Sequence, residues 1–492
     1  MKNLLLLPFL ALMLMMKFCT SKKDVTETNT SVFDYDSAGI SVNSKLNGFN
    51  AENLYFHYKG ESDADQLIAD LAPKILRFPG GTPANVYNIH GPGYGYRDAD
   101  LNKMVEGTGP YKNAQKSIKR NRTETQRTST VQNHAVDFVR LLKEVNADVL
   151  LVANLLGEDQ DILDMIGFFD ENGINIAGVE LGNEYYLKAY WSAFPNVNSY
   201  IARAKKAAIA IKSEYPSIRL GVVAASSSEI KNVSMKQKLY FDDWNETLGK
   251  EDFFDAFISH VYSKNKECDG EQGQSRFDCY LAHNSEFVRE ISGGFRSLSE
   301  TFQNRPVWIT EWNIKSVFDG LGNSTLQALY YADFALAMTS SPDIEIATYH
   351  NLLTSSTGYN MIAKDKSRPN AQAPSHVPRT VYPVARLLSE IFDEDFRRYS
   401  VPSNNIDPAL LTLGLFKSEA RELLFIVNKS NAELSFSGLG LEIDKPFNYE
   451  AVLGSKLSSS EWTMDQGQVK SEQTDKVRIK PYSVYRIEFD PS

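Results

Sequence analysis

Eight apolar runs, each short enough for a β-strand, alternate with helix-like segments between residue 39 and about residue 395. These runs are 40–50, 74–81, 147–157, 174–184, 218–226, 254–263, 306–314 and 344–352. The run ADVLLVANLLG (147–157) is apolar almost throughout, which is typical of a parallel strand buried on both faces. Apolar residues recur at a period near 3.6, the pattern of an amphipathic helix, in segments 132–146, 196–214, 284–302, 324–340 and 382–392.

Eight strands that are each followed by a crossover predict an α/β chain with a (β/α)8 TIM barrel over residues 39–395. A doubly wound open sheet is the alternative, but the glycine-rich nucleotide turn expected after its first strand is missing. From residue 396 to 492 the pattern changes to short alternating runs such as ELLFIVNKS and KVRIKPYSVYRIEFD. These runs predict an antiparallel β-sandwich, to which the segment near 34–45 is a candidate extra strand.

The N-terminus has the layout of an export signal. One lysine precedes an apolar stretch from Leu4 to Met16, which is too short to span a bilayer as a helix. Cys19 resembles the lipid acceptor of bacterial lipoproteins, although MKFC lacks the usual small residues before it. We therefore expect a signal peptide over 1–19, a polar tether over 20–38, and an exported, periplasmic or outer-membrane lipoprotein. Cleaved export without lipid and a cytosolic chain are the alternatives.

The two remaining cysteines and the net charge bear on compartment and partners. Cys268 and Cys279 lie in a polar stretch, where an exported protein is expected to join them in a disulfide. Free thiols are the alternative, and a zinc site would need further ligands close by. The net charge of −10 argues against nucleic-acid binding. We expect no nucleic-acid partner, and membrane contact only through a lipid on Cys19.

Polar side chains stand where several predicted strands end, which is where barrel enzymes place their catalytic groups. The fourth and seventh strands lie across the mouth of a barrel, so Glu184 and Glu311 are predicted to face each other. Two carboxylates that flank one site are what glycoside cleavage requires. The other candidates at strand ends are Arg77, Asn183, Tyr185, His260, Tyr262 and Trp312, and His350 fits a site residue or a core histidine equally well.

The neighbours of the two glutamates predict different roles for them. Arg77 and Tyr262 are expected to hydrogen-bond Glu311 and keep it ionised as a nucleophile. An amide and aromatic rings beside Glu184 favour a raised pKa and the role of acid. Asn183 is expected to contact a sugar hydroxyl, Trp312 to stack on a sugar ring, and His260 and Tyr185 to line the site. For each residue, a purely structural role in the core is the alternative.

Four motifs in order, LRFPGG, ELGNE, HVY and ITEWN, resemble those of the clan A retaining glycoside hydrolases, near the arabinofuranosidase, β-xylosidase and β-glucuronidase/heparanase branch. The resemblance implies a TIM barrel with an appended β-sandwich. It also implies that Asn183-Glu184 after strand four carries the acid/base and that Glu311 after strand seven is the nucleophile. RFPGGTPANVYN differs from the arabinofuranosidase and heparanase forms, so the resemblance does not fix the sugar.

The sequence thus predicts a retaining glycosidase that cleaves a plant or algal polysaccharide or oligosaccharide by double displacement, with no cofactor and no metal. The basic stretch 112–127, KNAQKSIKRNRTETQR, fits a clamp for an anionic glycan or a solvated loop. A glycan-binding protein on an inactive barrel is one alternative. An oxidoreductase or lyase is another, but the chain has no His-Glu-x-x-His helix, cysteine cluster or phosphate loop. Oligomeric state and exo or endo action stay open.

Overall fold

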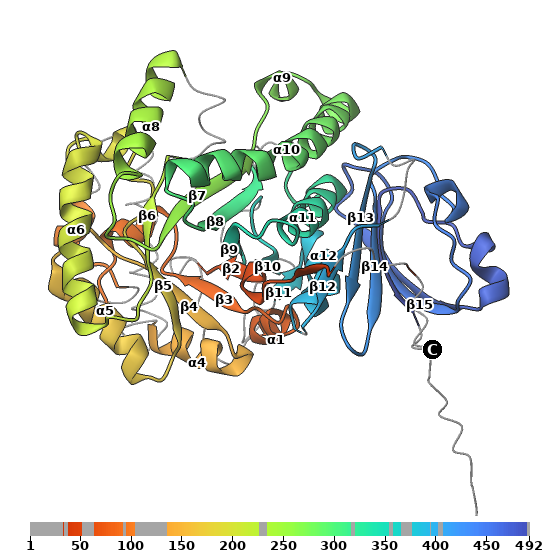
Figure 1. Ribbon diagram of the computed structural model, residues 1–492, viewed down its shortest axis with the longest axis horizontal. Helices are drawn as coiled ribbons and strands as arrows, with labels where there is room; N and C mark the ends of the chain where they lie inside the picture. Colours follow the sequence, from red (N-terminus) through yellow and green to blue (C-terminus); the bar gives the residue numbers. More distant parts are fainter. Residues whose placement is uncertain are drawn as a thin grey trace, which may run out of the picture.

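The computed structural model describes residues 33, 38–51, 63–91, 95–103, 135–225, 234–315, 320–353, 358–365, 376–393, 395–401 and 407–489. Eight parallel strands close into a barrel, with an antiparallel domain beside it (Figure 1). This confirms the predicted fold class, and the open-sheet alternative is wrong. The barrel strands are β2 (Gly48–Asn50), β3 (Ile75–Phe78), β4 (Asp148–Val152), β5 (Ile176–Glu180), β6 (Leu220–Val223), β7 (Ala256–Ser263), β8 (Val307–Ile314) and β9 (Ile344–Tyr349).

The first predicted run, 40–50, contributes to both parts of the molecule. Its start, β1 (Ile40–Ser41), pairs with β12 (Arg397–Tyr399) of the antiparallel sheet, as expected for an added strand near 34–45. Its end, β2, pairs with β3 and β9 and closes the barrel. A 3-10 turn separates them, because the side chain of Asn43 accepts a hydrogen bond from the Lys45 amide and caps Ser44–Leu46.

The predicted helices surround the barrel (Figure 1). They are α4 (Ala135–Val145), α6 (Val197–Glu214), α10 (Gly273–Thr301), α11 (Thr325–Met338) and α12 (Val381–Ser389). Asn196 caps α6 by accepting a hydrogen bond from the Ser199 amide at 3.1 Å. Helices that the periodicity did not predict are α1 (Asp63–Ala69), α2 (Asp98–Lys103), α5 (Asp159–Glu171), α8 (Met235–Leu248) and α9 (Lys266–Asp269).

The interior of the barrel is filled beneath its mouth by Trp308 of β8, which is fully buried. Gly178 of β5 and Gly221 of β6 make room for the indole. A Cβ at Gly178 would lie 2.4 Å from Trp308 Cη2, and one at Gly221 would lie 2.7 Å from its Cε3. Any larger residue at these two positions would therefore displace the indole from the barrel interior.

The antiparallel domain is one seven-stranded sheet in the described residues, in the order β1-β12-β13-β14-β17-β15-β16. Its longer strands are β13 (Leu411–Lys417), β14 (Glu422–Asn428), β15 (Phe447–Gly454), β16 (Trp462–Val469) and β17 (Ser483–Phe489). Along β14, Leu423, Phe425 and Val427 join the core shared with the barrel. The alternate residues Leu424 and Ile426 face a separate core with Phe436. This period of two buries both faces of the sheet.

A buried ion pair joins the two domains. Lys429 Nζ lies 2.7 Å from Asp333 Oδ2 on α11, and their side chains are 2% and 7% exposed. The substitution Lys429→Met should lower the free energy of unfolding by about 3–5 kcal/mol, because it leaves a buried carboxylate without its cation. Urea unfolding followed by tryptophan fluorescence measures this loss.

The exposed pair Lys480–Glu433 gives the matched control. Lys480→Met should change stability by no more than about 1 kcal/mol. An equal, small effect of both substitutions would show that the buried pair does not hold the domains together.

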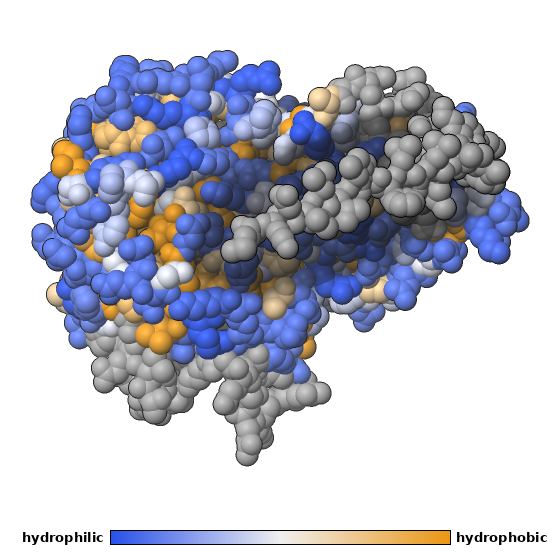
Figure 2. Space-filling model, turned by 60° about the horizontal axis from the view of Figure 1, so that its bottom comes forward, coloured by the Kyte–Doolittle hydropathy of each residue, from blue (hydrophilic) through white to orange (hydrophobic). Residues whose placement is uncertain are grey.

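The surface in the view of Figure 2 is mostly hydrophilic, and its hydrophobic residues form separate patches. No helix within the described residues is long and apolar enough to cross a bilayer.

Candidate active site

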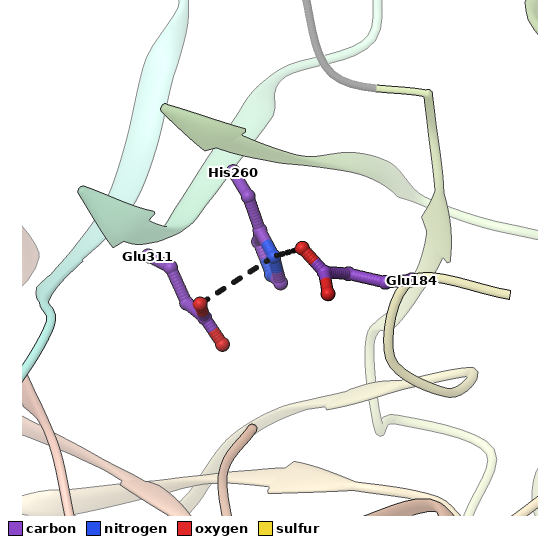
Figure 3. Close-up of side chains that lie close together, drawn as sticks. All are labelled: Glu184, His260 and Glu311. Carbon is purple, nitrogen blue, oxygen red and sulfur yellow. Dashed lines mark hydrogen bonds and ion pairs between the residues drawn. The ribbon is translucent and has the colours of Figure 1, made fainter. Parts of the chain in front are cut away.

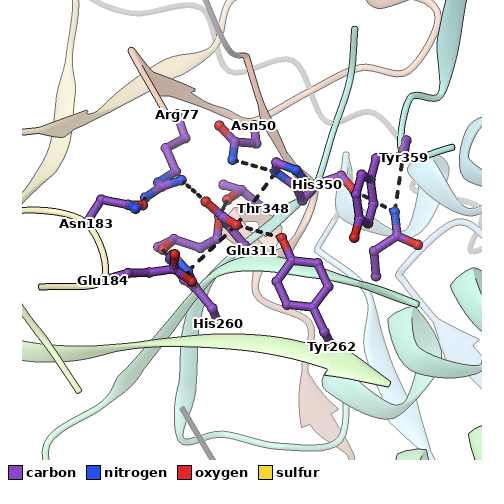
Figure 4. A network of polar contacts seen from close by, with 12 residues as sticks. Asn50, Arg77, Asn183, Glu184, His260, Tyr262, Glu311, Thr348, His350 and Tyr359 are labelled. Carbon is purple, nitrogen blue, oxygen red and sulfur yellow. Dashed lines mark hydrogen bonds and ion pairs between the residues drawn. The ribbon is translucent and has the colours of Figure 1, made fainter. Parts of the chain in front are cut away.

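Six of the predicted site residues meet at the carboxyl ends of the barrel strands (Figure 4). Arg77 comes from β3, Asn183 and Glu184 follow β5, His260 and Tyr262 lie on β7, and Glu311 lies on β8. Strand pairing sets part of this arrangement, because His260 is the direct neighbour of Glu311 across the β7–β8 ladder. The parallel register thus brings side chains that are distant in sequence to the same height in the barrel.

Arg77 is the centre of the network and is fully buried. Its Nε and Nη2 donate to the two oxygens of Glu180 at 2.7 and 2.8 Å, a bidentate pair. Its Nη1 donates to Glu311 Oε1 at 2.9 Å, and its Nη2 also donates to Asn183 Oδ1 at 2.9 Å. One guanidinium therefore fixes the positions of groups from β5, β8 and the loop after β5.

Glu311 is held as an anion. Its Oε2 accepts a hydrogen bond from the Tyr262 hydroxyl at 2.6 Å, while Arg77 donates to its other oxygen. Burial on its own would raise the pKa of Glu311. The neighbouring imidazoles, the Arg77 guanidinium and the Tyr262 hydroxyl outweigh burial and hold this pKa well below its usual range. Both contacts that the sequence analysis expected for Glu311 are present.

Glu184 stands on a constrained turn that follows β5. Its φ of 49° lies in the left-handed region, which a residue with a side chain seldom adopts. The turn is fixed by Asn85, whose side chain donates to the Asn183 carbonyl at 2.7 Å and accepts from the Asn183 amide at 2.9 Å. The Glu184 side chain is 18% exposed, against 7% for Glu311. Glu184 is thus the more accessible of the two carboxylates.

His260 lies between the two glutamates (Figure 3). Its Nδ1 is hydrogen-bonded to Glu184 Oε1 at 2.9 Å and lies 3.7 Å from Glu311 Oε2, while its Nε2 contacts Thr310 Oγ1 at 3.2 Å. Burial lowers the pKa of His260, but the charge of Glu311 and the bond to Glu184 outweigh burial and raise it. The His260 imidazole therefore takes up a proton more readily than a free imidazole does.

The structure adds Glu180, Asn50 and His350 to the site. Asn50 Nδ2 is 3.1 Å from His350 Nδ1, and the same nitrogen of His350 is 3.8 Å from Glu311 Oε2. Burial, which is only partly offset by Glu311, lowers the pKa of His350 to about 4, so this imidazole is neutral at pH 7. The sequence allows either role for His350, and its motifs do not single out Glu180 or Asn50. The sequence signal for Glu180 is an acid inside an apolar strand, and the signal for Asn50 is a polar residue at the end of the first barrel strand.

The structure does not bring Tyr185 and Trp312 to the barrel mouth, which corrects the prediction that they contact substrate. Tyr185 is fully buried, its hydroxyl accepts from the Leu155 amide, and its ring folds over Gly182. Trp312 follows Glu311 in β8, so its side chain leaves the opposite face of the strand. Its indole stacks on Tyr331 of α11, with ring centres 5.0 Å apart.

A metal ion would have to compete with existing bonds in this cluster. Glu184, His260 and Glu311 each offer a ligand atom, and these atoms lie within 4.8 Å of one another. Both oxygens of Glu311 already accept hydrogen bonds, one of them from the fixed cation Arg77. The arrangement therefore suits two carboxylates that act on a substrate between them.

Of the remaining predicted residues, Cys268 and Cys279 are joined by a disulfide that links α9 to α10, with their Cα atoms 5.5 Å apart. The signal segment, Cys19 and the basic stretch 112–127 lie outside the described residues.

No protein-family model and no curated protein sequence matches this chain. Solved structures do. The GH51 arabinofuranosidase from Xanthomonas axonopodis pv. citri is 13% identical with a TM-score of 0.64, and the match covers 92% of this chain and 97% of that one. The α-L-arabinofuranosidase from Thermotoga maritima is 15% identical with a TM-score of 0.62, covering 92% and 98%. A 4-O-α-L-rhamnosyl-β-D-glucuronidase from Fusarium oxysporum is 10% identical with a TM-score of 0.58, also covering 92% and 98%.

At these identities the likeness establishes the fold over almost the whole chain. The resemblance to clan A, which the sequence motifs indicated, is thus confirmed for the architecture of a barrel with an appended antiparallel domain.

Proposed function

We propose that this protein is a glycoside hydrolase that retains the configuration of the anomeric carbon. The observation that carries the proposal is that carboxylate oxygens of Glu184 and Glu311 lie within 4.8 Å of each other at the barrel mouth. Retaining glycosidases keep their carboxyl groups about 5–5.5 Å apart, whereas inverting ones need about 6.5–9.5 Å to admit a water. The similar folds, two arabinofuranosidases and a rhamnosyl-glucuronidase, support a glycosidase.

In the proposed mechanism, Glu311 attacks the anomeric carbon while Glu184 gives a proton to the departing oxygen. The bond from the anomeric carbon to that oxygen breaks, and an ester bond to Glu311 forms. Glu184, now ionised, then takes a proton from a water that attacks the same carbon and releases Glu311. Arg77 and Tyr262 suit this cycle because they hold Glu311 as a carboxylate in both the resting and the released state.

Two buried polar atoms are suited to bind sugar hydroxyls. Asn183 Nδ2 and Asn50 Oδ1 are buried and have no hydrogen-bond partner among the residues that the structure describes. Burying a polar atom without a hydrogen-bond partner costs free energy, and a ligand hydroxyl that bonds to the atom removes this cost. Asn183 is hydrogen-bonded to Arg77, and Asn50 to His350, and both of these partners contact Glu311. The sugar ring is therefore proposed to lie between Asn183 and Asn50, above the Glu311 carboxylate. A glycan-binding protein without catalysis would need no such close pair of glutamates.

The acid/base role is tested by Glu184→Ala. We expect kcat on an oligosaccharide to fall roughly 100- to 10,000-fold, because the leaving alkoxide loses its proton donor. A dinitrophenyl glycoside needs little protonation to leave, so its glycosylation step should be nearly unaffected, and azide should raise its turnover by forming a glycosyl azide of retained configuration. Steady-state kinetics and NMR of the azide product measure these effects.

Glu214→Ala, at the exposed end of α6, is the matched control and should behave as the wild type. Equal losses of Glu184→Ala on both kinds of substrate, without rescue by azide, would remove Glu184 from the acid/base role.

A further inference from the structure

A lysine lies at the carboxyl end of β8, against the tyrosine that hydrogen-bonds the proposed nucleophile. Lys315 is the residue that follows β8, four positions after Glu311, and it is half-buried. Its ammonium lies 4.4 Å from the ring centre of Tyr262, the residue whose hydroxyl donates to Glu311. The ammonium is therefore one aromatic ring away from the carboxylate that the proposed mechanism uses.

The backbone of Lys315 is fixed on both sides. Its amide donates to the Ser263 carbonyl at 2.8 Å, which continues the β7–β8 ladder beyond the strand end. Its carbonyl accepts from the Tyr359 hydroxyl at 2.9 Å. Tyr359 in turn packs edge-on against His350, with ring centres 5.1 Å apart. These bonds fix the point from which the lysine side chain starts, next to residues that pack around the site.

The charges at the mouth give this lysine a specific use. Glu180 and Glu311 share one guanidinium, Arg77, so this group of three side chains carries one negative charge more than it carries positive charges. Burial is the main cause that lowers the pKa of His350 to about 4, so this imidazole is neutral at pH 7. A sugar that carries its own negative charge would be repelled by this excess negative charge unless a further cation offset the repulsion.

We propose that Lys315 makes the site selective for a negatively charged substrate. Its ammonium binds an anionic group, a carboxylate or a sulfate, on the glycan held above Glu311. This inference rests on the proposed glycosidase function and names its substrate class, which is a uronic acid or a sulfated sugar.

The test uses matched substrates on the full chain. Oligosaccharides that contain uronic acids are compared before and after reduction of their carboxyl groups, sulfated oligosaccharides are compared before and after desulfation, and 4-nitrophenyl glucuronide is compared with the glucoside. The wild type should prefer the charged member of one series, and that series distinguishes carboxylate from sulfate. Lys315→Gln should lower kcat/KM on the charged member roughly 10- to 100-fold, mainly through KM, and should change the neutral member less than about threefold. Lys315→Arg should restore most of the loss.

Lys74→Gln is the control, because it removes the same charge at the opposite end of β3, where Lys74 pairs with Asp393. It should leave the preference unchanged. A wild type that cleaves only neutral glycans, or a Lys315→Gln variant that loses activity equally on both members of a pair, would overturn the proposal while leaving the glycosidase intact. If no member of the panel is cleaved and a 2-fluoro glycoside panel of the same sugars labels no residue, the glycosidase function and this inference fall together.

Discussion

Replacing Glu311 with alanine is expected to lower kcat on every substrate by roughly 10,000-fold or more, because the covalent route then has no nucleophile. The protein should stay folded, since the smaller residue removes a buried charge and leaves Arg77 with its bidentate partner Glu180. Azide should enter the space that is left and restore turnover, giving a glycosyl azide with inverted anomeric configuration. Kinetics with an activated aryl glycoside and NMR of the product measure both effects.

The nucleophile can also be identified directly by covalent labelling. A 2-fluoro glycoside of a sugar that the protein cleaves should leave a covalent adduct on Glu311, found by mass spectrometry of peptides. Glu300→Ala, on the exposed side of α10, serves as the control and should be labelled and turn over as the wild type does. An adduct on any other residue, or a hydrolysis product whose anomer is inverted, would contradict the assignment of Glu311.

The sequence predicted most of the site because strand ends in a parallel barrel share one face. Arg77, His260 and Glu311 come from three different strands, and none lies near another in sequence. Once eight strands are recognised, their carboxyl ends must surround one mouth, so the residues at those ends become neighbours without any knowledge of side-chain positions. The motifs then distinguish the two glutamates, because Arg77 and Tyr262, which both lie on strands, donate hydrogen bonds to Glu311.

Local backbone geometry set the limit of that reasoning. The alternation of a strand predicts which way a side chain points only while the strand continues, and β5 ends at Glu180. Gly182 has a φ of 97° and Glu184 a φ of 49°, so the chain reverses and turns the Tyr185 ring into the core. For Trp312, the alternation itself would have sufficed: its neighbour Glu311 points inward, so the indole must point toward α11.

One of the helices that was not predicted, α8, has a weak pattern for a physical reason. On α8, Met235 and Leu239 are exposed by 71% and 62%, while Phe241 and Trp244 are buried. Apolar residues therefore occur on both sides of this helix, and their period gives no clear face.

The place of Glu180 in the site could have been inferred from the sequence. A carboxylate in an apolar buried strand requires a partner, and Arg77 is the cation in the apolar strand KILRF.

This buried pair makes Arg77 the residue whose loss should affect both stability and activity. Arg77→Met should lower the free energy of unfolding by about 3–5 kcal/mol, because Glu180 is left buried without a cation. It should also lower kcat/KM by roughly 100-fold or more, since Glu311 loses the donor on one oxygen and Asn183 loses its anchor. Arg77→Lys should recover only part of either quantity, because an ammonium cannot make the bidentate contact.

A second substitution separates the two effects of Arg77. In the double variant Arg77→Met/Glu180→Gln the uncompensated charge is gone, so urea unfolding should show most of the stability restored, whereas kcat/KM should stay low because Glu311 still lacks its donor. Arg386→Met removes a half-exposed arginine that pairs with Glu450 at 2.8 Å, and should cost no more than about 1 kcal/mol. If the double variant recovered activity together with stability, Arg77 would act only as a structural cation, and the ionised state of Glu311 would have to depend on His260 and Tyr262 alone.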